Sequence, residues 1–120
     1  MSLRAIRGAI QIDIDSQQEM RSAVIELMTT LMEKNELTAE DLVSVIFTST
    51  PDLVSDFPAA FAREMGLGAV PLLCAVEINV PGSLPRTIRT LVHCETQLAK
   101  NEISHVYLRG AVALRRDIAQ

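Results

Sequence analysis

The chain has 120 residues, 48% of them hydrophobic, and a formal net charge of −4, so we expect one domain over residues 1–120 whose apolar surface favours oligomerisation. The acidic balance argues against a nucleic-acid partner, because phosphate recognition needs a concentrated basic surface. No apolar run approaches the ~20 residues of a membrane-spanning helix and the start lacks the apolar segment of a signal peptide, so we expect a cytoplasmic protein with no membrane partner.

The first two expected elements are a strand and a helix. Residues 3–14 are rich in Ile and Ala, which predicts a strand with Arg7 on one face. Ser16 and Glu19 then form a capping box, the arrangement that satisfies free amide groups at a helix start. Apolar residues follow at spacings of three and four, so the sequence predicts an amphipathic helix that ends near Asn35.

The middle of the chain predicts a strand, a short helix and another strand. Residues 42–48 are short and β-branched, which is typical of a buried strand. Pro58 suits a first helical position and Gly66 supplies a stop, so a helix is expected from Pro58 to Met65. Residues 69–80 are expected to form a third strand, closed by a Pro-Gly-Ser turn.

Two further strands complete the prediction. Residues 88–95 are compatible with helix or strand, but their β-branched residues favour a fourth strand. Residues 105–114 are expected to form the last strand. The order β-α-β-α-β-β-β predicts an α+β domain with a mixed β-sheet that helices cover on one face.

A few polar residues stand out from this pattern. Nine of the 11 basic residues are Arg, which indicates either recognition of a small anion or merely the base composition of the genome. Glu77 lies in an apolar segment, so it either faces solvent at a sheet edge or meets a partner. Alone, Cys74 suggests a small buried residue, and His93 and His105 suggest surface or hydrogen-bonded roles. Two cysteines in the cytosol should stay reduced, and the Cys and His spacing fits no zinc pattern, so we expect neither a disulfide nor a metal.

Several segments resemble AroH-class chorismate mutases in their order and spacing, and together they cover nearly the whole chain. They are Ile6-Arg7-Gly8-Ala9, Thr50-Pro51-Asp52-Leu53, Phe57-Pro58-Ala59, Arg63-Glu64, Pro71 to Glu77, Ile88-Arg89, His105-Val106-Tyr107-Leu108 and Leu114-Arg115. The resemblance implies a chorismate-mutase-like subunit, related to the ferredoxin-like fold, that assembles into a pseudo-barrel homotrimer. It places three sites at the subunit interfaces.

The resemblance also implies the role of each site residue in converting chorismate to prephenate. Arg7 would bind a substrate carboxylate, Tyr107 would hydrogen-bond a carboxylate, and Arg89 would lie beside the ether oxygen of the breaking bond. Glu77 and Cys74 would meet the ring hydroxyl. The apolar wall of the site would consist of Phe57, Ala59, Leu72, Leu73 and Leu114. Arg63 and Arg115 would lie near its mouth.

The implied reaction is a concerted rearrangement that requires no cofactor, nucleophile or metal, so positioning and charge stabilisation suffice. One geometric point stays open, because Cys74 and Glu77 would point to opposite faces of a regular strand. A bulge, a strand end or a backbone contact from Cys74 would be needed to bring both to one ligand. The alternative function is a trimeric small-carboxylate-binding or reactive-intermediate-deaminase-like protein.

Overall fold

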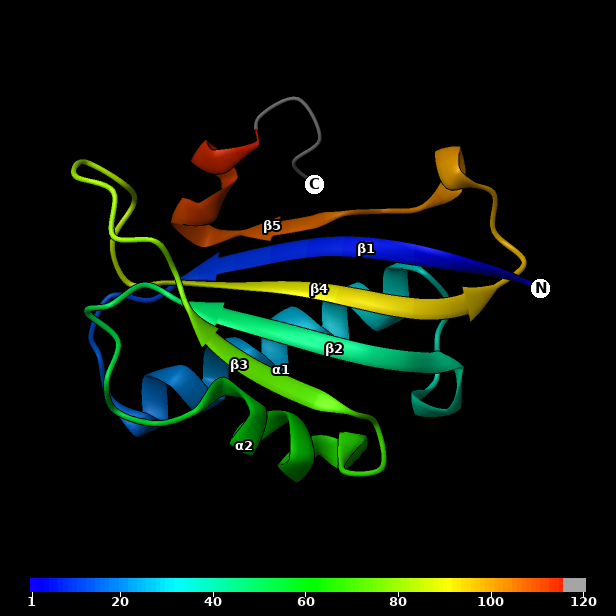
Figure 1. The fold of residues 1–120 in the computed structure, drawn as a ribbon, viewed down its shortest axis with the longest axis horizontal. Helices are drawn as coiled ribbons and strands as arrows, with labels where there is room; N and C mark the ends of the chain where they lie inside the picture. Colours follow the sequence, from blue (N-terminus) through cyan, green and yellow to red (C-terminus); the bar gives the residue numbers. More distant parts are fainter. Residues whose placement is uncertain (116–120) are drawn as a thin grey trace.

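A computed structural model of the protein describes residues 1–115, in which five strands form one mixed sheet of order β3-β2-β4-β1-β5 (Figure 1). The strands are β1 (Ser2–Gln11), β2 (Leu42–Ser49), β3 (Leu72–Val76), β4 (Thr87–Thr96) and β5 (Val106–Leu108). β4 pairs antiparallel with β1 and β2, whereas β1–β5 and β2–β3 are parallel pairs. The predicted α+β class with a mixed sheet is therefore confirmed.

The helices lie on one face of this sheet, as expected (Figure 1). They are α1 (Gln17–Lys34) and α2 (Pro58–Ala62), and short helical turns occupy Ala39–Asp41, Arg63–Leu67, Lys100–Glu102 and Arg109–Leu114. Neither α1 nor α2 covers the opposite face, which we call the open face (Figure 1); among the described residues, the short helix Arg109–Leu114 packs over its β5 edge. The side chains of the open face are therefore the ones free to meet a ligand or a second subunit.

The predicted first helix is confirmed as α1. Ser16 is its N-cap, and its hydroxyl accepts a hydrogen bond of 3.1 Å from the Glu19 amide. The predicted apolar stripe is buried against the sheet, and its fully buried members are Met20, Ala23, Val24, Leu27, Met28 and Leu31. Gly8 permits this close packing, because a Cβ there would lie 3.0 Å from a methyl carbon of Thr90 and 3.2 Å from one of Leu27.

Asn35 joins the end of α1 to the segment that leads into β5. Its buried side-chain amide donates to the Leu31 carbonyl at 2.8 Å and to the Ser104 carbonyl at 2.9 Å. Its side-chain oxygen accepts from the Ser104 amide at 2.8 Å. These bonds give hydrogen-bond partners to three backbone groups, and they fix the approach of β5 to the sheet.

The third strand is shorter than predicted. The expected range was 69–80, whereas β3 spans Leu72–Val76. The reason is its partner: β2 pairs with β3 only from Val45 to Ser49, and the Glu77 amide makes one further bond, to the Ser49 carbonyl, at 2.9 Å. Beyond that point the chain has no neighbouring strand and leaves the sheet.

The last strand is also shorter than the predicted 105–114. β5 covers Val106–Leu108, and Arg109 then adopts a left-handed φ of 54°, which ends the extended conformation. Arg109–Leu114 instead forms a 3₁₀ helix. Gly110 of this helix lies close to the side chain of Gln11 at the end of β1.

The remaining predictions agree with the structure, apart from their ends. The first strand stops at Gln11 and does not reach Ile14, and the second and fourth strands are confirmed as β2 and β4. The second helix begins at Pro58 as expected, and its wider last turn contains Gly66 at a φ of 106°, which only glycine adopts readily.

Replacing Asn35 tests the link between α1 and β5. Asn35→Ala removes three hydrogen bonds at a buried position, so the free energy of unfolding should fall by roughly 2–4 kcal/mol, at about 1 kcal/mol for each bond. Denaturant unfolding at one fixed protein concentration measures the change. Glu33→Ala, an exposed position of the same helix end, is the control and should change stability by less than ~0.5 kcal/mol. Equal stabilities for the two variants would contradict this account of Asn35.

Candidate active site

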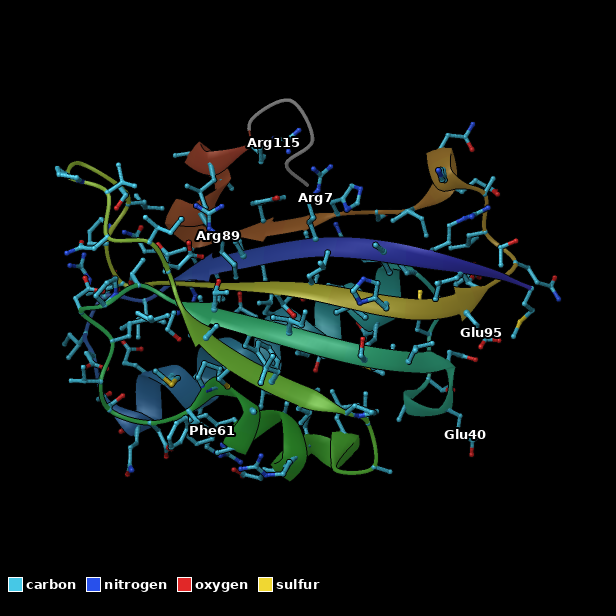
Figure 2. The ribbon with its side chains drawn as sticks, viewed as in Figure 1. Arg7, Glu40, Phe61, Arg89, Glu95 and Arg115 are labelled. Carbon is cyan, nitrogen blue, oxygen red and sulfur yellow. The ribbon has the colours of Figure 1, made fainter. Side chains whose placement is uncertain are left out.

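The first part of the site lies on the open face, where β1 and β4 present two arginines. Ala9 of β1 is directly opposite Arg89 of β4, so Arg7, two residues earlier on the same face, is a diagonal neighbour of Arg89. Diagonal neighbours lie ~7–8 Å apart, within reach of one small ligand for long side chains. Figure 2 shows Arg7 and Arg89 over this part of the sheet and Arg115 beyond its β5 edge, whereas Glu40 and Glu95 lie toward the other end of the sheet.

Glu77 fixes one of these arginines. Its carboxylate oxygen Oε1 lies 3.1 Å from the Nε of Arg89 and accepts a 2.6 Å hydrogen bond from the Thr48 hydroxyl. The Glu77 side chain is 21% exposed and that of Arg89 is 48% exposed, so the pair lies at the surface with its carboxylate partly covered. Because the contact is to Nε, the terminal nitrogens of the guanidinium can still donate to an anionic ligand. Glu77 thus meets a partner, one of the two alternatives left by the sequence.

Tyr107 and Leu114 lie beside Ala9 on the same face. Tyr107 of β5 pairs in register with Ala9 and is only 4% exposed. Tyr107, Ala9 and Ala111 form a small buried cluster, and Leu114 packs against it. The 3₁₀ helix that replaces the end of the predicted strand carries Ala111 and Leu114, and half-buried Arg115 directly follows it. We name Arg7, Glu77, Arg89, Tyr107 and Leu114 the open-face group.

His105 supports Arg7 from the edge of the sheet. Its Nδ1 accepts a 3.0 Å hydrogen bond from the Arg7 backbone amide, so the ring is neutral at that nitrogen. Burial lowers the pKa of His105 below its ordinary value, and the positive charges of Arg7 and Arg115 lower it further. The expected hydrogen-bonded role of this histidine is confirmed. His93 likewise shares a hydrogen bond with Ser44, at 3.2 Å.

The second part of the site lies around the edge strand β3 and helix α2. Phe57 precedes α2 and is 68% exposed, and a cavity of about 310 Å³ lies between its loop and residues 74–76. Ala59 is buried in the core, and Arg63 is exposed one turn later. Leu72 and Cys74 turn toward the helix side, where both pack against the core. We name these residues the edge group, namely Phe57, Ala59, Arg63, Leu72 and Cys74.

The structure does not bring the Cys74 side chain to Glu77. Cys74 pairs with buried Phe47 on the helix side of the sheet, whereas Glu77 reaches Thr48 and Arg89 on the open face. The strand keeps its regular alternation, which leaves a backbone contact as the remaining way for Cys74 to share a ligand with Glu77. Leu73 precedes Cys74 in β3 and points to the other face, so it is on the open face with Glu77 and is 62% exposed.

The two groups are separated within one subunit. β3 is two strands from β4 and three from β1, so its backbone lies about 10–14 Å from the backbones of the two strands that carry the arginines, at ~4.8 Å per strand. Most of the edge group also turns to the helix side. A small ligand held between Arg7 and Arg89 would therefore lie away from most of the edge group of the same chain.

Sequence reasoning missed Thr48, the hydroxyl donor to Glu77. Its face could be expected from the sequence, because alternation along a strand puts Thr48 on the same face as Ile46. Its relation to Glu77 and Arg89, however, depends on the strand order β3-β2-β4, which the sequence did not reveal.

Three further features of residues 1–115 concern possible metal ligands, thiols and apolar helices. No group of three or more His, Cys, Asp or Glu side chains in that range is placed to hold a metal ion. The thiols of Cys74 and Cys94 are both free, and burial raises the pKa of Cys94. In the same range no helix combines the length and the apolarity needed to cross a membrane.

The His105 contact predicts a pH dependence of stability. Since folding lowers the His105 pKa, its contribution is fully present above the unfolded value of ~6.5 and is lost as the pH falls through the lower folded value. Between pH 7.5 and pH 5, the free energy of unfolding should therefore fall further for the parent than for His105→Asn, which keeps an acceptor but does not titrate. Parallel losses in the two proteins would rule out this contribution.

Comparisons with known proteins agree with this geometry. The chain is 47% identical over 117 residues to chorismate mutase AroH of Thermus thermophilus, covering 97% of this chain and 96% of that protein. It is 36% identical over 120 residues to chorismate mutase AroH of Bacillus subtilis, covering 99% and 94% respectively. The solved structure of a chorismate mutase from Clostridium thermocellum matches with a TM-score of 0.90 and 43% identity, covering 92% of this chain and 98% of that one. The model of the chorismate mutase type I family matches residues 3–118, and the chain belongs to that family.

Proposed function

We propose that this protein is a cytoplasmic enzyme that converts chorismate to prephenate, for aromatic amino-acid biosynthesis. The observation that carries the proposal is Arg89, a guanidinium that Glu77 holds on the open face beside Arg7 and Tyr107. Family membership supports the same reaction. Two neighbouring cations suit a dicarboxylate substrate. The rearrangement itself requires no nucleophile or metal.

The proposed catalysis is electrostatic and conformational. In the transition state the ether C–O bond breaks ahead of C–C bond formation, which leaves negative charge on the ether oxygen. Arg89 stabilises that charge, and a preorganised donor at such a point contributes about 2.7–4 kcal/mol, or ~10²–10³ in rate. Arg7 and Tyr107 bind carboxylates that are charged throughout the reaction, so they contribute to affinity and to selection of the compact conformer.

The remaining residues complete the pocket in this proposal. Glu77 orients Arg89 and also contacts the ring hydroxyl of the substrate. The backbone of Cys74 contacts the same hydroxyl. Arg63 and Arg115 lie at the mouth and attract the anionic substrate. The apolar wall consists of Phe57, Ala59, Leu72, Leu73 and Leu114.

A trimer would unite the two groups that one subunit keeps apart. The open face exposes large apolar side chains, including Leu3 at 61% and Leu73 at 62%, which favours its burial by a neighbouring subunit. We infer a ring of three subunits in which the open-face group of one meets the edge group of the next. Sedimentation equilibrium should then give about three times the chain mass of 13.2 kDa.

Arg89 variants test the catalytic proposal through the absorbance change of chorismate. Arg89→Ala should lower kcat by at least ~10²-fold, because the charge on the ether oxygen loses its donor. Arg89→Lys should recover only part of the rate, since lysine keeps the charge but lacks the planar fork. A stable dicarboxylate that mimics only the ground state should lose much less affinity in either variant.

Arg7→Ala is the matched comparison, because its main effect should be a higher KM. Every variant must remain trimeric for the rates to be compared. Near-normal kcat in trimeric Arg89→Ala would overturn the assignment of Arg89. If the parent bound chorismate without converting it, the small-carboxylate-binding function would replace the enzyme.

A further inference from the structure

The loop between β2 and α2 is held to the start of β4 by one carboxylate. Asp52 accepts a 2.5 Å hydrogen bond from the Thr50 hydroxyl and bonds of 3.0 and 3.2 Å from the Arg86 backbone amide. The Thr50 hydroxyl in turn accepts from the Thr87 amide at 3.0 Å, and the Thr50 amide donates to the Thr87 carbonyl at 3.0 Å. Asp52 is therefore the centre of a network that joins this loop to the first residues of β4.

The network reaches the residues next to Arg89. Arg86 and Thr87 immediately precede Ile88 and Arg89, and Thr87 is only 1% exposed. Arg86 has a left-handed φ of 50°, which is uncommon for a residue with a side chain. Its backbone amide is the group that donates to the Asp52 carboxylate. Its Nε also donates to the Ile12 carbonyl at 3.0 Å, and the Ile12 amide returns a bond of 2.9 Å. The conformation at Arg86 thus fixes where β4 begins relative to β1.

The same loop carries Phe57 of the edge group. Five residues beyond Asp52, Phe57 leads into α2, and a second carboxylate holds the intervening backbone. Asp15 accepts from the Val54 amide at 2.9 Å and from the Ser55 amide at 3.2 Å. With anchors at Asp52 and Asp15, the loop is tied both to β4 and to the segment before α1.

We propose that Asp52 is a positioning residue that sets the start of β4, and with it Arg89, relative to the loop that carries Phe57. The inference rests on the proposed function, because Arg89 and Phe57 belong to the two groups that form the site. In the trimer described above, these two groups serve neighbouring sites, so each Asp52 aligns two half-sites within one subunit.

Asp52→Ala tests the proposal against a matched carboxylate at another place in the fold. Asp41 accepts from the Thr38 amide at 2.8 Å and from the Thr38 hydroxyl at 3.1 Å, so Asp41→Ala also removes a threonine–aspartate turn. Both variants should remain trimeric, with similar decreases in thermal midpoint. Asp52→Ala should lower kcat at least ~10-fold, since a misplacement of about 1 Å can cost ~10²-fold. Asp41→Ala should stay within ~2-fold of the parent.

A spectroscopic measurement separates positioning from a general loss of stability. The Nε–H of Arg89 lies against Glu77, and its resonance in a ¹H–¹⁵N correlation spectrum reports that geometry. The resonance should shift or broaden in Asp52→Ala and remain in place in Asp41→Ala. An unchanged Arg89 resonance together with parent-like kcat in Asp52→Ala would overturn the proposal. A parent protein that fails to convert chorismate refutes the proposed function instead, and the resonance still decides whether Asp52 positions Arg89.

Thr50 provides a second pair of variants if Asp52→Ala does not fold. Thr50→Ser keeps the hydroxyl that joins Asp52 to the Thr87 amide, whereas Thr50→Val removes it at nearly equal volume. The serine variant should retain the parent kcat and Arg89 resonance, and the valine variant should change both. Identical kcat and spectra for the two variants would contradict the network.

Discussion

The contact on which the proposed site depends is the one between Glu77 and Arg89 across Thr48. It requires that β3, β2 and β4 be neighbours in that order, so that a residue just beyond β3 can reach across one strand to the next. An ion pair this exposed contributes only ~0–1 kcal/mol to stability. Its value is geometric, because it fixes the orientation of a guanidinium that would otherwise sample many rotamers.

Catalysis of a concerted rearrangement makes this constraint important. Such a reaction offers no proton transfer or covalent intermediate to accelerate, so the rate depends on how well fixed charges match the transition state. Interactions of this kind strengthen when water is excluded. On the isolated open face Arg89 remains 48% exposed, so coverage by a second subunit would complete the pocket and also strengthen its electrostatics.

The sequence predicted the elements whose boundaries depend on local chemistry. The Ser16 cap defines the start of α1, and Gly66 defines the end of the second helix through its positive φ. The ends of β3 and β5 were wrong because they depend on tertiary structure: β3 ends where β2 stops pairing, and β5 ends at the left-handed Arg109. No local pattern distinguishes such positions from continued strand.

The site was predictable to a different degree. The alternation that separates Cys74 from Glu77 follows from strand periodicity alone, and the structure keeps it. That Arg7 and Arg89 are neighbours depends on the register of β1 against β4, which the sequence did not supply. Thr48 and Asp52 were missed as functional residues because their partners come from other strands or loops. The individual catalytic roles came from resemblance and remain proposals.

Hybrid trimers test most directly whether neighbouring subunits share each site. Arg89→Ala disables the open-face group, and Phe57→Asp places a repelling carboxylate in the edge group at an exposed position. If the two inactive variants are unfolded together and refolded at equal ratio, random assembly of a three-subunit ring should restore about a quarter of the parent activity, because ~1 in 4 interfaces then combines two intact groups. A refolded mixture that forms trimers of the expected mass but stays as inactive as either variant alone would contradict the shared site.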